Sequence, residues 1–161
     1  MMCYDNSELF IRHIDTMTTH RPLPLTSPKQ RQGSLFEQRA CEFLQDQGLI
    51  LVVQNWHQPK FGELDLVMIE QGAAWATLVF IEVRQRKLSN FGNAAHSVTT
   101  SKQHKVIKAA RYFLQQHPEY RDYDCRFDVI AYDTASQATQ YKQERDSQPE
   151  WIQGAFIATA W

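Results

Sequence analysis

The order of helix-type and strand-type segments is the feature of this chain that most constrains its fold. Apolar residues recur at helical spacing in two segments, while β-branched apolar runs and alternating patterns mark the others. The segments are a helix over 34–47, strands over 49–55, 63–70 and 78–86, a helix over 99–116, a strand over 125–132 and an edge-like strand over 150–158. This order, α-β-β-β-α-β followed by an edge strand, predicts an α/β protein with a mixed central sheet and helices on its faces.

Short motifs predict where the two helices begin and end. Ser34-Leu35-Phe36-Glu37 has the form of a capping box, and Gly48 is expected to end the helix that follows. The run 99–101 offers hydroxyl caps for the second helix, and Pro118 ends it. We therefore expect one domain over 33–158, a mobile or extended Pro-rich arm over 1–32 and a short tail over 159–161. The arm is expected to be solvated, with contact to nucleic acid as the alternative.

Composition excludes several classes of protein. The chain has 161 residues and a formal net charge of -1, so it is long enough for one domain and does not coat nucleic acid by bulk charge. Cys3, Cys41 and Cys125 are scattered, which argues against a disulfide framework and a zinc ribbon. No apolar run approaches the ~20 residues of a membrane span, and no signal-peptide pattern is visible at residue 1 onward. We expect a cytoplasmic protein with no membrane partner.

Two of the expected strands carry charge on an apolar face. Alternation places Asp65 on the side of Val67 and Ile69, and it places Glu82 and Arg84 together on the face of the apolar residues before them. A carboxylate on a half-buried face is unfavourable unless it is paired or binds a metal, and Mg²⁺ prefers such oxygen ligands. The alternative is an inert ion network with Arg84, Arg86 or Arg126, and spacing alone leaves both interpretations open.

The helices add further candidates. Glu37 lies on the flank of the first helix's apolar stripe, so it either closes the capping box or faces the acidic site as a third metal ligand. Lys102 and Gln103 lie on the inner arc of the second helix in its first turn, where phosphate can bind. The outer residues of that helix favour an ordinary solvated face: His104, Lys105, Lys108 and Arg111.

Arg126 and Asp128 share one face of a later strand. Because opposite charges one pleat apart compensate each other, we expect them to be structural. The alternative is that Asp128 is a further metal ligand.

Five ordered motifs together resemble the YraN family over residues 33–156. They are Gly33-x-x-x-Glu37, Gly62-Glu63-Leu64-Asp65-Leu66, Phe80-Ile81-Glu82-Val83-Arg84-x-Arg86, Ser101-Lys102-Gln103 and Arg126-Phe127-Asp128-Val129. That family looks related to the PD-(D/E)xK nucleases and the archaeal Holliday-junction resolvases. The resemblance implies a restriction-endonuclease-like three-layer fold.

The resemblance also implies a metal-dependent endonuclease or resolvase acting on DNA, including branched or non-canonical DNA. It implies that Mg²⁺ or Mn²⁺ is held by Glu37, Asp65, Glu82 and the Val83 carbonyl, with Arg84 and Lys102 as catalytic cations. The expected nucleic-acid contacts are Arg86, Lys102, Gln103 and Lys105. Oligomeric state stays open, with a dimer as one arrangement, and no sequence-specific base reading is expected.

Two departures from the superfamily pattern bear on activity. Leu64 replaces the Pro of the pattern, and Arg84 replaces the catalytic Lys. Arginine stays charged and cannot act as a base, so Lys87 and Lys102 are candidates to substitute for the missing Lys. A non-catalytic nucleic-acid-binding or partner-binding module is therefore the alternative function. A weaker one is a subunit of a larger complex that exposes Trp151, Phe156 and Trp161, for which core and tail positions are the favoured interpretation.

Overall fold

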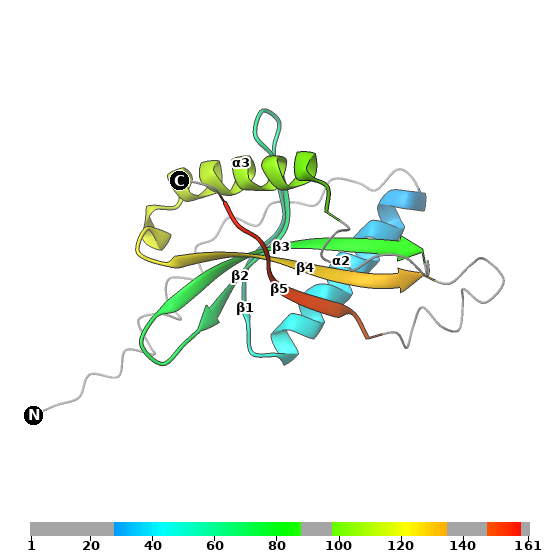
Figure 1. Ribbon diagram of the computed structural model, residues 1–161, viewed down its shortest axis with the longest axis horizontal. Helices are drawn as coiled ribbons and strands as arrows, with labels where there is room; N and C mark the ends of the chain where they lie inside the picture. The colour runs from blue at the N-terminus through cyan, green and yellow to red at the C-terminus, as the bar shows by residue number, and fades with distance from the viewer. Residues whose placement is uncertain (1–27, 88–97, 135–147, 159–161) are drawn as a thin grey trace, which may run out of the picture.

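The helices and strands form three layers, with a sheet between two helices (Figure 1). The computed structural model describes residues 28–87, 98–134 and 148–158. Its elements are α2 (Pro28–Asp46), β1 (Ile50–Gln58), β2 (Gly62–Gln71), β3 (Ala76–Lys87), α3 (Thr100–Gln116), the short 3-10 helix η2 (Pro118–Tyr120), β4 (Asp124–Thr134) and β5 (Glu150–Phe156). The predicted α/β class and element order are confirmed.

The sheet is mixed, as its sequence predicts. Its strands lie in the order β1-β2-β3-β4-β5, and only β3 and β4 run parallel. A parallel pair needs a crossover, and α3 provides it between β3 and β4. The sheet therefore begins as the antiparallel meander β1-β2-β3. It is parallel between β3 and β4 and ends with the antiparallel strand β5.

Each face of the sheet carries its own apolar core. Beneath α3, Phe113 packs with Val67 and Phe80, whereas beneath α2, Phe36 and Leu44 pack with residues of the opposite strand faces. These side chains are almost fully buried, and they come from the helical stripes that the sequence predicts. The strands between the two cores are thus apolar on both faces. A charged side chain on them is unfavourable unless it is paired or binds a metal.

The first helix begins earlier than predicted. It starts at Pro28, so Ser34 lies in its interior and the capping-box interpretation is wrong. Proline suits the first helical position because the N–H that it lacks would have no intrahelical partner there. Residues 28–32 of the expected arm are therefore helical, while residues 1–27, the loop at 90–93 and the tail at 159–161 lie outside the described residues. The helix ends as expected before Gly48, whose φ is 91°.

Neither of the two described α-helices is long and apolar enough to cross a membrane.

Candidate metal and phosphate site

The two strands that carry the predicted acids separate at those acids. The β2–β3 ladder ends at the pair Leu66↔Ile81, and Asp65 and Glu82 are the next residue on each strand. Val83 lies just beyond, and its backbone N–H donates to Asp65 Oδ2 at 2.8 Å. The Asp65 carboxylate thus satisfies a donor that the departing strand no longer pairs.

Both carboxylates lie near the first turn of α3. Lys102 of that helix forms an ion pair with Glu82, and the charge of Asp65 raises the pKa of the same lysine. Had the two acids pointed to opposite faces, a shared metal site would have been excluded.

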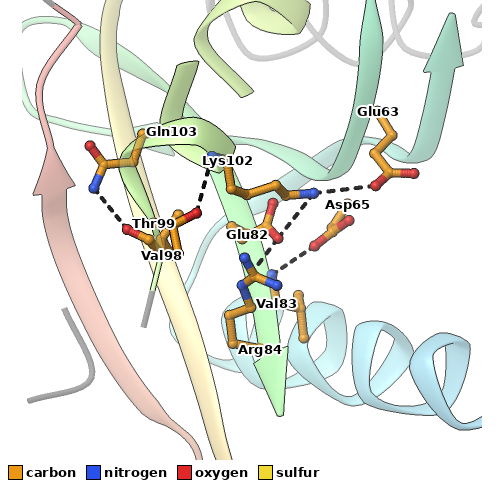
Figure 2. A network of polar contacts seen from close by, with 9 residues as sticks. All are labelled: Glu63, Asp65, Glu82, Val83, Arg84, Val98, Thr99, Lys102 and Gln103. Atoms are coloured by element: carbon orange, nitrogen blue, oxygen red, sulfur yellow. Dashed lines mark hydrogen bonds and ion pairs between the residues drawn. The ribbon is translucent and has the colours of Figure 1, made fainter. Parts of the chain in front are cut away.

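Two cations reach the Glu82 carboxylate from different elements (Figure 2). Lys102 Nζ, from the first turn of α3, lies 3.2 Å from Glu82 Oε1 and 3.2 Å from Glu63 Oε1. Arg84 Nε lies 3.4 Å from Glu82 Oε1, and among the described residues this buried nitrogen has no hydrogen-bond partner. Glu82 itself is 3% exposed, so its charge depends on these neighbours.

The beginning of α3 packs over the beginning of β2. Gly62 has a φ of 121°, which other residues rarely adopt, and a Cβ there would make only ordinary van der Waals contact with Ala109 Cβ and the Lys105 carbonyl, at 3.6 Å each. The side chain of Thr99 caps the helix by accepting from the Lys102 N–H at 3.3 Å. Because this N–H is engaged in the cap, a phosphate there would meet the Lys102 ammonium rather than the N–H.

The acidic groups resist ionisation. Burial, followed by the charge of Asp65, raises the pKa of Glu82 to about 7. Burial also raises the pKa of Asp65, against the hydrogen bond from Val83 and the charge of Lys102. Burial lowers the pKa of Lys102, but Glu82, Asp65 and Glu63 outweigh it, so the ammonium stays protonated at neutral pH. Lys102 is therefore a cation of the site and not a base.

Glu37 approaches the same site from the other layer. Burial and then Asp65 raise the pKa of Glu37 to about 7, while a hydrogen bond from the Asn55 side chain lowers it. Asn55 has a φ of 54°, and its neighbours Gln54 and Trp56 pair with Leu66 and Leu64 on either side of Asp65. Asparagine tolerates this left-handed conformation better than most residues.

The three predicted acids converge only partly. Asp65 interacts with both Glu82 and Glu37, yet no three described His, Cys, Asp or Glu side chains lie close enough to share one ion. The expectation of one ion shared by all three carboxylates is therefore wrong for this arrangement. Together with Glu63, four carboxylates face the two cations Arg84 and Lys102, so the fully ionised cluster carries an excess of two negative charges.

The residues predicted to contact nucleic acid differ in how the structure places them. Gln103 donates from its amide to the Val98 carbonyl at 3.0 Å, so this amide is engaged within the α3 cap. Lys105 is exposed farther along α3. The side chains of Arg86 and Lys87 lie outside the described residues.

Two participants were missed by the sequence reasoning. Glu63 holds Lys102, and Asn55 holds Glu37. Glu63 could have been found from its position two residues from Asp65 at the beginning of the strand. An asparagine inside an otherwise β-type run was the visible signal for Asn55, because asparagine is depleted from regular strands.

The charged pair on β4 is separate from this site. Arg126 Nε donates to Asp128 Oδ1 at 2.8 Å, and the guanidinium also pairs with Glu70. The inert network predicted as an alternative for Asp65 and Glu82 thus does not include Arg126.

The aromatic residues proposed as an exposed contact are largely packed into the protein. Phe156 is 9% exposed and stacks on Phe127, and the partly buried Trp151 lies edge-on to Phe43. That interpretation is wrong for both residues, and Trp161 lies outside the described residues.

Comparison with known proteins places the chain in a family. The model of the uncharacterised protein family UPF0102 matches residues 36–132. The chain belongs to this family. A UPF0102 protein of Psychrobacter cryohalolentis is 64% identical over the whole of both chains, and one of Psychrobacter arcticus is 62% identical over the whole of both. A UPF0102 protein of Alcanivorax borkumensis is 41% identical over 84% of this chain and 99% of its own. This is the family that the five motifs resembled as YraN.

Proposed function

We propose that this UPF0102 protein is a metal-dependent endonuclease or resolvase that hydrolyses DNA phosphodiesters, in branched and other non-canonical DNA as well as in linear DNA. The observation that carries the proposal is the pair Asp65 and Glu82. These carboxylates lie where two central strands separate, and a lysine and an arginine reach the second of them. Carboxyl groups whose pKa is raised by burial and by a neighbouring charge cluster at functional sites.

The residues present fit a divalent cation. Mg²⁺ and Mn²⁺ take hard oxygen ligands, usually one or two protein carboxylates with water and phosphate oxygens. The pKa of Glu82 is raised to about 7 because its negative charge lies buried beside Asp65, and a divalent cation would relieve that repulsion. Asp65, Glu82 and the Val83 carbonyl would hold the ion, with Glu37 contributing through water from the second layer.

The chain's own residues supply the rest of the chemistry. A bound ion would polarise the scissile phosphate and lower the pKa of an attacking water. Lys102 and Arg84 would orient the phosphate and stabilise negative charge that develops on its oxygens, since both are fixed donors at the carboxylate edge. Lys102 would thus substitute for the superfamily's Lys only as a cation beside Glu82, and not as a base. Lys102 and Arg84 can position the phosphate without either of them acting as a base.

Calorimetric titration with Mn²⁺ tests the proposal directly. Wild-type protein, Asp65→Asn, Glu82→Gln and the exposed control Asp122→Asn are titrated, and labelled branched and linear DNA is then incubated with each. We expect both site variants to lose more than about 100-fold in Mn²⁺ affinity, beyond the usual effect of an outer-shell change. Cleavage should disappear with them and persist in the control. Unchanged Mn²⁺ binding in both site variants would contradict the proposal.

A non-catalytic DNA-binding module is the second candidate. It is favoured by Arg84 in place of the usual Lys and by Lys102, which already compensates the Glu82 charge without a metal. This protein would bind DNA with no dependence on Mn²⁺ and would cleave no substrate. The same titration therefore separates the two candidates.

A further inference from the structure

All charged side chains of α3 are positive. Between Thr100 and Gln116 the helix carries Lys102, Lys105, Lys108 and Arg111 and no acidic residue, although the whole chain has a net charge of -1. Lys105 and Arg111 are exposed, and no described carboxylate lies within ion-pair distance of Lys105 or Lys108. The helix begins at Thr100, two residues before Lys102 of the candidate site, and is about 25 Å long.

A groove along this helix is lined by α3 residues and by Phe61 from the turn between β1 and β2. It has a volume of about 330 Å³, and Phe61, Lys108 and Tyr112 are among its lining residues. Phe61 stacks on Tyr112 with ring centroids 3.7 Å apart, and Lys108 Nζ lies 5.4 Å from the Phe61 ring while donating to the Lys60 carbonyl at 2.8 Å. The aromatic pair therefore packs beneath Lys108 and helps to position its ammonium.

We propose that this α3 surface, formed by Lys105, Lys108, Arg111 and the exposed Lys60, binds the phosphate backbone of a DNA duplex arm next to the cleavage position. The proposal rests on the proposed nuclease function for the identity of the polymer. Charge complementarity favours a polyanion, and continuity with Lys102 connects the surface to the scissile phosphate.

The same geometry favours a duplex over a single strand. Single-strand sites combine cations with aromatic faces on which bases stack. Here Tyr112 covers one face of Phe61 and Lys108 lies over the ring, so the aromatic pair is engaged with the protein itself. Long cationic side chains on a convex helix instead reach a phosphate backbone, which fixes position without reading bases.

Two charge-matched double variants test this surface. Lys105→Gln with Arg111→Gln removes two charges from it, and Arg39→Gln with Arg121→Gln removes two charges elsewhere. Binding of a fluorescent duplex and of one of its single strands is measured in EDTA, so cleavage does not interfere, over a series of salt concentrations. Circular dichroism and thermal melting verify that both variants are folded.

We expect the wild-type protein to bind the duplex more tightly than the single strand. The α3 variant should lose about 10-fold or more in duplex affinity, and its log Kd against log salt slope should fall by about 2, since each duplex phosphate contact contributes ~0.9. The control should match wild type. Equal duplex binding by the two variants, or a wild-type preference for the single strand, would overturn the proposal.

Failure of this inference is distinguishable from failure of the nuclease proposal. Binding that depends on α3 without any cleavage retains the surface and rejects the nuclease. Cleavage that depends on Asp65 and Glu82, with binding indifferent to the α3 variant, retains the nuclease and rejects the surface.

Discussion

Two regions of one sheet bury carboxylates in contrasting ways. On β4, Asp128 is fully buried and accepts four hydrogen bonds, from Arg126 Nε and Nη2, from Trp151 Nε1 and from the Gly154 N–H, at 2.8 to 3.0 Å. Where β2 and β3 separate, Asp65 accepts a backbone hydrogen bond from Val83, and the ion pairs of Glu82 are 3.2 and 3.4 Å long.

The difference distinguishes an acid whose acceptor positions are filled by the fold from a pair of acids that retain free ones. A buried carboxylate with all its acceptor positions used is held in one geometry and has no capacity for a ligand. Asp65 and Glu82 instead repel each other, and burial raises both of their pKa values. Asp128 therefore stabilises the sheet, while the other pair is suited to receive a cation.

The largest expected effect on stability is that of Asp128→Asn. The change removes the negative charge from a network with four donors, and breaking a buried ion pair costs about 3 kcal/mol or more. For a chain of this size that corresponds to a fall in Tm of about 10 °C. Thermal melting and Mn²⁺ titration of the same sample measure both quantities, and Mn²⁺ affinity should stay at the wild-type value.

The exposed control for this prediction is Asp122→Asn, which should change neither quantity. If Asp128→Asn lost Mn²⁺ binding while its Tm stayed unchanged, Asp128 would be a ligand and the contrast between the two regions would be wrong.

The next effect concerns Arg84, whose Nε faces Glu82. Arg84→Ala should reduce the cleavage rate by about 100-fold or more, the scale of removing one transition-state donor. Its Mn²⁺ affinity should stay level or rise, because a positive charge next to the ion is lost. Arg84→Lys should retain or increase cleavage, since it restores a cation of similar reach. Rates on labelled DNA at low salt, measured with Mn²⁺, compare the three proteins.

A binding module would respond differently to the same two variants. Arg84→Lys would produce no cleavage, and Arg84→Ala would only weaken DNA binding and lower its salt dependence. If all three proteins bound DNA equally and none cleaved it, Arg84 would have no functional role.

The sequence predicts the layers and the central acids because both are local signals. Period-2 alternation places Asp65 and Glu82 on one face, and a helical stripe identifies Phe36, Ala40 and Leu44 as core residues. The mixed sheet follows from the order of the elements, since the crossover through α3 requires a parallel pair.

Contacts between distant segments could not be derived in the same way. Lys102 and Glu63 are 39 positions apart, and their pairing depends on how α3 packs over the beginning of β2. The predicted start of α2 is six residues too late because Ser34-x-x-Glu37 is also compatible with a helix interior. No residue between Pro28 and Ser34 prevents the helix from beginning at Pro28. The prediction that three carboxylates share one ion fails because Glu37 belongs to the helix on the opposite face of the sheet. How close that helix brings Glu37 to Asp65 depends on packing between distant segments.

The smallest expected effect is that of Asn55→Gly. It tests whether the acids at the edge of the site differ from Asp128 in having few hydrogen-bond donors. Asn55→Gly keeps the left-handed backbone, for which glycine has no steric penalty, and removes the amide that lowers the pKa of Glu37. The pKa of Glu37, about 7 in the wild type, should therefore rise, which carbon NMR of the side-chain carboxyl measures directly. Mn²⁺ affinity at neutral pH should fall slightly, because more protons compete for the site.

The pH dependence of folding follows with a defined sign. A carboxyl whose pKa rises on folding binds more protons in the native state. The contribution of Glu37 to the free energy of unfolding therefore falls as pH rises from 4.5 to about 7. In Asn55→Gly this fall should extend to higher pH, and in the control Glu37→Gln it should be absent. Adding Asn55→Gly to Glu37→Gln should change the pH profile no further, because the group that the amide acts on is gone. An unchanged Glu37 pKa in Asn55→Gly would show that the amide does not hold Glu37 in solution.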